Sequence, residues 1–66
     1  MTNAPTENLT RADGSPLRVL VVDDEQMLAD LLASALRYEG WEVTTAGSGI
    51  AAVRSAQEID PDLIAL

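Results

Sequence analysis

The feature that most constrains the fold of this chain is a short apolar run that ends in three carboxylates, just before a helical pattern begins. The run covers residues 18–22, and Asp23, Asp24 and Glu25 follow it. A strand this apolar is expected to be buried on both faces, as in a parallel sheet. Its carboxyl end then lies where open α/β proteins bind their ligands. Because adjacent carboxylates repel one another, a hard cation such as Mg²⁺ is the simplest group to offset their charge.

Composition narrows the chemistry that such a site can support. The chain has 66 residues and neither cysteine nor histidine, so disulfides, thiolate metal sites and a histidine base are all excluded. A domain near this size has a marginal core. The net charge of −7 disfavours contact with nucleic acid or an anionic membrane. There is no apolar run near the roughly 20 residues of a membrane span, and no signal-peptide pattern, so we expect a cytoplasmic location.

The chain divides into a polar leader and a regular pattern of alternating strands and helices. Residues 1–16 are rich in polar residues, glycine and proline, and we expect this leader to be disordered. From Leu17 onward the order is strand, helix, strand, helix, strand, which predicts βαβ units and a parallel sheet. A helix is predicted from about Glu25 to Tyr38 and is closed by Gly40. Its predicted core-facing side chains are Leu28, Leu31, Leu32, Ala35 and Leu36.

The second half of the pattern repeats this arrangement. Residues 41–45 alternate in polarity as an edge strand does. Ser48 is the predicted N-cap of a second helix, which Asp60 and Pro61 close. Residues 62–66 then form a third, apolar strand. The side chains of the second helix that are predicted to face the sheet are Ala52, Val53, Ala56 and Ile59.

Four linked motifs give this pattern a specific resemblance. They are Val-Leu-Val-Val-Asp-Asp-Glu at 19–25, Tyr-Glu-Gly-Trp-Glu-Val at 38–43, Thr-Ala-Gly-Ser-Gly at 45–49 and Asp-Pro-Asp-Leu-Ile-Ala-Leu at 60–66. Together they resemble the first half of a CheY-like receiver domain, the phosphoacceptor module of two-component response regulators. The resemblance implies a truncated flavodoxin-like α/β fold, with three parallel strands in the order 2-1-3, over residues 17–66.

The resemblance also assigns roles to two residues. Asp24 is similar to the residue that coordinates Mg²⁺ directly, and Asp23 to the one that acts through a water. Glu25 is open to two interpretations, a third ion-binding carboxylate or a charge that offsets the positive end of the helix dipole. The family's phosphoacceptor aspartate directly follows the third strand, which places it one position beyond Leu66. We therefore expect no catalytic residue in this chain, and no activity of an enzyme.

The family's biology supplies the expected partners. The resemblance implies that an intact parent takes its phosphoryl group from a sensor histidine kinase. It suggests a transcription regulator of the OmpR/PhoB type, which contacts DNA through a domain outside this chain. We expect the isolated fragment to be partly folded, dynamic or self-associating and not a stable monomer, because the third strand has an apolar, unpaired edge.

Two alternatives remain open. A haloacid-dehalogenase-type phosphotransferase also places aspartates and Mg²⁺ after a first parallel strand. Its motif needs a second acid two positions after the first, and usually a threonine or valine beyond it. Here Asp23 is followed at that spacing by Glu25, and then by Gln26 and Met27, which fits that motif poorly. The other alternative is a truncated product without activity, which the sequence does not distinguish from a receiver fragment.

Overall fold

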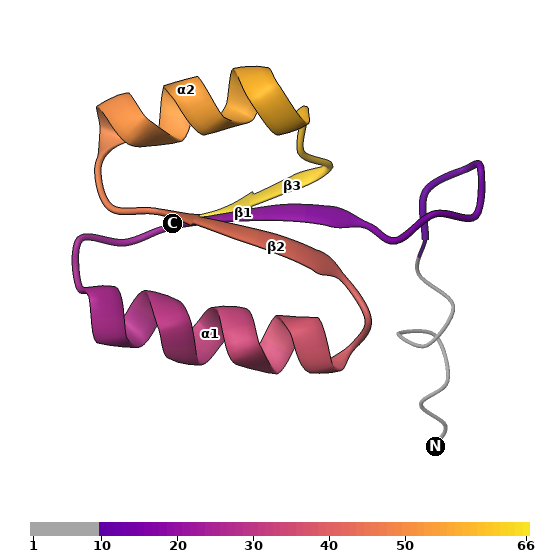
Figure 1. Ribbon diagram of the computed structural model, residues 1–66, viewed down its shortest axis with the longest axis horizontal. Helices are drawn as coiled ribbons and strands as arrows, with labels where there is room; N and C mark the ends of the chain where they lie inside the picture. Colours follow the sequence, from indigo (N-terminus) through magenta and orange to yellow (C-terminus); the bar gives the residue numbers. More distant parts are fainter. Residues whose placement is uncertain (1–9) are drawn as a thin grey trace.

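The polypeptide forms three layers, with one helix on each face of a central sheet (Figure 1). The computed structural model describes residues 10–66. The predicted disorder of residues 1–9 lies outside these described residues. The elements are β1 (Arg18–Val22), α1 (Gln26–Tyr38), β2 (Glu42–Ala46), α2 (Gly49–Ile59) and β3 (Leu63–Ala65). Each element falls close to the range that the hydrophobic pattern predicts.

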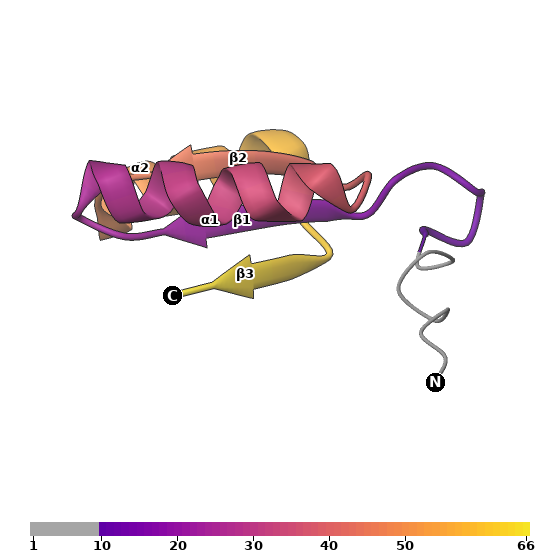
Figure 2. The same ribbon diagram turned by 90° about the horizontal axis from the view of Figure 1, so that it is seen from below.

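The sheet confirms the predicted order and direction of the strands. Its order is β2-β1-β3, and β1 pairs in parallel with both neighbours. Val21 lies opposite Thr45 on one side and Ala65 on the other. Since all three strands run in one direction, their carboxyl ends meet at the same edge of the sheet. Figure 2 shows that α1 lies over β1 and β2, whereas β3 extends beyond it.

The core is small and centres on β1. Val19, Leu20 and Val21 are fully buried, which confirms that β1 is covered on both faces. On the α1 side, Val19 and Val21 pack with two alanines of α1 and one valine of β2, and two partly buried residues pack against this cluster. The alanines are Ala29 and Ala33, the valine is Val43, and the partly buried residues are Leu36 and Trp41.

The predicted core face of α1 is wrong for four of its five residues. Only Leu36 packs against the core, whereas Leu28, Leu31, Leu32 and Ala35 are exposed. The small residues Ala29 and Ala33 face the sheet instead. Both sets of residues recur at helical spacing, so periodicity alone does not separate them. Residues recur every 100° around a helix, which places Leu28 and Leu32 on the flank beside the alanine stripe and Leu31 on the side of α1 away from it.

The carboxyl end of α1 shapes the outer edge of the sheet. Gly40 follows the helix with φ of 95°, and its N–H donates to the carbonyl of Arg37 over 2.8 Å, which confirms the predicted glycine cap. The Arg37 guanidinium Nη2 donates to the backbone carbonyl of Val43 over 2.8 Å. Because Glu42 donates its N–H to Leu17 on the β1 side, strand alternation turns the Val43 carbonyl to the outer side. Arg37 therefore covers part of the free edge of β2.

Helix α2 begins as predicted but buries fewer side chains. The Ser48 hydroxyl accepts the N–H of Ala51 over 3.1 Å, which confirms the N-cap. Ala52, Ala56 and Ile59 are partly buried, but Val53, which we expected to face the sheet, is exposed. Asp60 ends the helix in the left-handed region, with φ of 50°. The covered face of α2 is thus narrower than the pattern suggested.

Residues 10–16, which are part of the predicted disordered leader, form a tight turn at the amino end of β1. Thr10 and Pro16 make an antiparallel bridge, and Arg11 donates its N–H to the Ser15 carbonyl over 2.8 Å. Asp13 accepts both the hydroxyl and the N–H of Ser15. The described part of the leader therefore has a defined conformation.

No helix within residues 10–66 has the length and apolar character that crossing a membrane requires.

Candidate functional site

The acidic residues lie at the carboxyl edge of the sheet, between β1 and α1. The N–H of Asp23 donates to the carbonyl of Ala46 over 3.1 Å, so pairing with β2 continues one residue past the end of β1. On the other side, the register of Val21 with Ala65 brings the end of β3 to the same level. The ends of all three strands therefore surround the start of the loop that carries the carboxylates.

Asp23 is held by a local turn. It is partly buried, and its Oδ1 accepts the N–H of Glu25 over 2.9 Å. Such a turn, in which an aspartate bonds the backbone two residues on, fixes the direction of the side chain. The hydrogen bond uses Oδ1, and by fixing the carboxylate group it also fixes the direction of Oδ2. Asp23 is thus a preoriented acceptor with remaining capacity for a cation or a water.

Asp24 and Glu25 are both exposed, and they differ in their backbone setting. Asp24 stands between the strand and the helix, where its carboxylate is open to solvent. Glu25 is the N-cap residue of α1, not its first helical residue, and its side chain makes no capping hydrogen bond. Its carbonyl accepts the N–H of Ala29. The charge of Glu25 is therefore near the helix start, where the dipole interpretation places it.

The donor set is suited to part of a magnesium shell. Mg²⁺ prefers oxygen ligands and is commonly held by one or two carboxylates, with waters in the remaining positions. Asp23 and Asp24 supply two carboxylates of this kind, and one of them is preoriented. Within residues 10–66 no three histidine, cysteine or acidic side chains are grouped closely enough to hold a metal ion. The described residues therefore fit a partial magnesium site, completed by water or by other groups.

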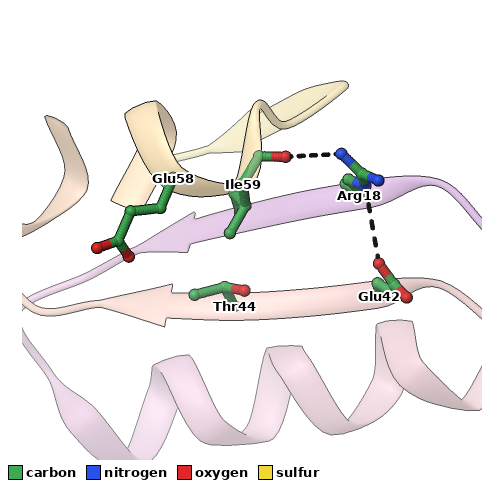
Figure 3. Close-up of a pocket in the computed structure, with 5 residues that line it drawn as sticks. All are labelled: Arg18, Glu42, Thr44, Glu58 and Ile59. Carbon is green, nitrogen blue, oxygen red and sulfur yellow. Dashed lines mark hydrogen bonds and ion pairs between the residues drawn. The ribbon is translucent and has the colours of Figure 1, made fainter. Parts of the chain in front are cut away.

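A hollow lies away from the carboxylates, toward the amino ends of β1 and β2. It has a volume of about 260 Å³ and lies between α2 and the sheet. Figure 3 shows the Arg18 side chain in it, with Nη1 donating to the Ile59 carbonyl over 3.0 Å and Nε 3.8 Å from Glu42. Thr44 and Glu58 complete its lining. Arg18 thus joins β1, β2 and the end of α2, a structural role that strand periodicity did not indicate.

Asp60 and Asp62 lie at the amino end of β3, as expected, and so at the opposite edge from Asp23. Asp62 nevertheless has partners that sequence reasoning missed. It accepts the N–H of Arg18 and forms an ion pair with Arg11. The available signal was topological, because the amino ends of adjacent parallel strands must meet and these ends carry opposite charges.

Comparison with known proteins finds similarity along most of the chain. The probable transcriptional regulatory protein TcrX of Mycobacterium tuberculosis is 53% identical over 58 residues, which are 88% of this chain and 25% of that protein. The transcriptional regulatory protein TrcR of the same organism is 50% identical over 56 residues, 85% of this chain and 22% of that protein. The DNA-binding response regulator MtrA of Mycobacterium leprae is 43% identical over 49 residues, 74% of this chain and 22% of that protein.

The chain spans about a quarter of the length of these curated relatives. No model of a protein family matches it.

Proposed function

We propose that this chain, which belongs with the receiver domains of transcriptional response regulators, supplies the magnesium-binding part of a phosphoryl-accepting site. In this proposal Asp24 binds Mg²⁺ directly, and Asp23 binds it chiefly through a water. When bound, the ion offsets the negative charge of a phosphoryl group and of the carboxylates around it. The relatives are named as regulators, not as enzymes, which agrees with a role in signalling.

The observation that carries this proposal is the common level of the strand ends. Asp23 is bonded to the end of β2, and Val21 is paired with Ala65 near the end of β3. A carboxylate directly after β3 would therefore lie at the same edge as the acidic pair. These carboxylates must lie at one edge if all of them are to contact the same ion. The turn at Asp23 supports the proposal because it orients a ligand before any ion arrives.

The parent protein's partners follow from the same proposal. We propose that a sensor histidine kinase donates the phosphoryl group, and that the parent regulates transcription through a DNA-binding part outside this chain. The relatives support this, since they include a DNA-binding response regulator. The net charge of −7 also favours protein partners over DNA for the present residues. We also propose a cytoplasmic location, because the relatives are named as transcriptional and DNA-binding regulators.

The metal role is tested by titrating the ¹⁵N-labelled chain with Mg²⁺ and following the amide signals. We expect weak binding that shifts residues 23–26 most. Asp24→Asn should weaken it at least fivefold, because even two unit charges 4 Å apart attract by about 1 kcal/mol in water and Mg²⁺ carries two charges. Asp60→Asn is the matched control, since Asp60 is exposed at the opposite edge. Equal affinities in all three proteins would overturn the assignment.

The phosphoryl step is tested on a polypeptide that carries the natural sequence beyond Leu66. We expect acetyl phosphate with Mg²⁺ to add one labile phosphoryl group to an aspartate after β3, as read by intact mass. Asp24→Asn should lower the yield, and Asp60→Asn should leave it unchanged. A stable adduct, or one formed equally well without Mg²⁺, would contradict the proposed site.

A further inference from the structure

Strand β3 has little to hold it in place. It has three residues and pairs only with β1. Neither helix packs against it in the described part of the chain, and Leu63 and Ile64 are half exposed. A short strand without side-chain packing has a weakly specified register, and a slip of one residue turns every side chain to the other face. What fixes β3 must therefore lie at its ends.

Asp62, just before β3, forms two hydrogen bonds with Arg18, one as donor and one as acceptor. The N–H of Asp62 donates to the Arg18 carbonyl over 2.8 Å. The N–H of Arg18 donates to the Asp62 Oδ2 over 2.9 Å. The carboxylate thus takes the place of a backbone carbonyl in the ladder, and only one register brings it to the Arg18 N–H.

Arg11 adds a second contact to the same oxygen. Its Nε lies 3.8 Å from the Asp62 Oδ2, and the two side chains are 25% and 28% exposed. The tight turn of residues 10–16 delivers Arg11 to this place, through the bridge of Thr10 with Pro16 and the backbone bonds between Arg11 and Ser15. Because the turn is formed by its own bonds, Arg11 loses less side-chain and backbone freedom on pairing.

Arg18 connects this group to the rest of the sheet. Its guanidinium reaches the Ile59 carbonyl at the end of α2 and lies 3.8 Å from Glu42 (Figure 3). Asp62 is therefore bonded to a residue that is itself held by α2 and β2. We call Arg11, Arg18 and Asp62 the clasp.

We propose that Arg11 and Asp62 are positioning residues, which fix the register of β3 on β1 and thereby hold the carboxyl end of β3 beside Asp23 and Asp24. The register claim stands on the clasp alone, whereas its consequence for the ion rests on the proposed function. The link is the strand itself, about 10 Å of extended backbone between the clasp and the acidic edge. The leader turn thus acts on the site from the opposite end of the sheet.

Amide hydrogen exchange tests the register claim on the full chain. The N–H of Asp62 points to β1, and strand alternation points the N–H of Ile64 the same way. Arg11→Gln should speed exchange at these two amides about two- to fivefold, the range for a partly exposed ion pair. Asp62→Ala should speed it about tenfold, because a ladder bond is also lost. Exchange at Asp23, which is bonded to β2, should not change.

Two matched variants serve as controls. Arg54→Gln removes an exposed arginine of α2, and Asp60→Asn removes a neighbouring exposed charge while keeping a side chain that tolerates a positive φ. Neither should change exchange in β3. Unchanged exchange at Asp62 and Ile64 in both clasp variants would overturn the register claim.

Paramagnetic Mn²⁺ tests the consequence for the ion. In the unaltered chain Mn²⁺ at the acidic pair should broaden the Ala65 amide, and Arg11→Gln should reduce that broadening without changing it at Gln26. Faster exchange with unchanged broadening at Ala65 would overturn the positioning role. If Mn²⁺ broadens no signal near Asp23, the proposed function fails, and the exchange data still decide the register claim.

Discussion

At Gly40 a single residue determines how α1 ends. Its φ of 95° lies in the left-handed region, and a Cβ built there meets nothing within 4 Å. Any cost of a side chain is therefore conformational and not steric crowding by neighbours. Gly49, at the start of α2, is equally open but has no positive φ. The two glycines therefore differ in backbone conformation and not in crowding.

Gly40→Ala should lower the free energy of unfolding by about 1 to 2 kcal/mol, the cost of the left-handed conformation for an L residue. Gly49→Ala should raise it by about 0.4 to 1 kcal/mol, because alanine restricts the unfolded chain and fits a helix. Urea unfolding followed by circular dichroism measures both. Changes of the same sign in the two variants would contradict the backbone assignments.

Asp13 is the residue of the leader turn whose ionisation matters. The hydrogen bond from the Ser15 hydroxyl, then that from the Ser15 N–H, lowers the pKa of Asp13 below its ordinary value of 3.8. A lowered pKa means that the contribution of Asp13 to the turn is present above 3.8 and is lost as the pH falls through the folded-state pKa.

Ser15→Ala should raise the pKa of Asp13 toward 3.8, because the larger of the two hydrogen bonds is removed. Carboxyl carbon shifts recorded between pH 2 and 6 measure the change. A pKa of Asp13 that is the same with and without the hydroxyl would show that the turn is not formed as described.

Among the elements, α1 shows where sequence reasoning succeeds and where it fails. Its ends were predictable because the signals are local, namely the acidic residues before it and Gly40 after it. Its buried face was not, since two sets of apolar residues recur at helical spacing. The sheet accepts the alanines because a helix with small residues approaches it closely. The distance between a helix and the sheet depends on tertiary packing, and the spacing of apolar residues along the sequence does not reveal it.

This assignment gives a direct contrast between two positions of α1. Leu31 is 68% exposed and Ala33 is 0% exposed. Leu31→Gln should change the free energy of unfolding by no more than about 0.5 kcal/mol, as at other surface sites. Ala33→Leu should lower it by about 1 to 3 kcal/mol through overpacking. Denaturant titration compares them, and a larger loss for Leu31→Gln would restore the leucine face as the core.

The whole molecule combines a small core with a large apolar surface. The strand order was predictable from the family resemblance, and the parallel direction of the strands from the alternation of strands and helices. The clasp was not, because Asp62 is far from Arg11 and Arg18 in the sequence, and no local rule pairs it with them. The two site residues Asp23 and Asp24 were located correctly at the carboxyl edge, and their metal role stays a prediction. The exposed large apolar residues include Leu28, Leu31, Leu32, Leu63, Ile64 and Leu66.

The exposed apolar surface predicts self-association of the 66-residue chain, opposed by its net charge of −7. Raising the salt concentration from about 0.01 to 1 M shortens the Debye length from about 30 to 3 Å, so repulsion between copies should fall and association should rise. Sedimentation velocity at both concentrations measures this. A monomer with a cooperative thermal transition at either salt concentration would show that the described fold is self-sufficient.

The bond from Arg37 to the Val43 carbonyl has a consequence for the order of assembly. Both residues precede β3 along the chain, so they leave the ribosome first. Part of the outer edge of β2 can thus be covered before β3, the second neighbour of β1, has been made. We expect this contact to favour addition of β3 at the open edge of β1 over pairing at the outer edge of β2.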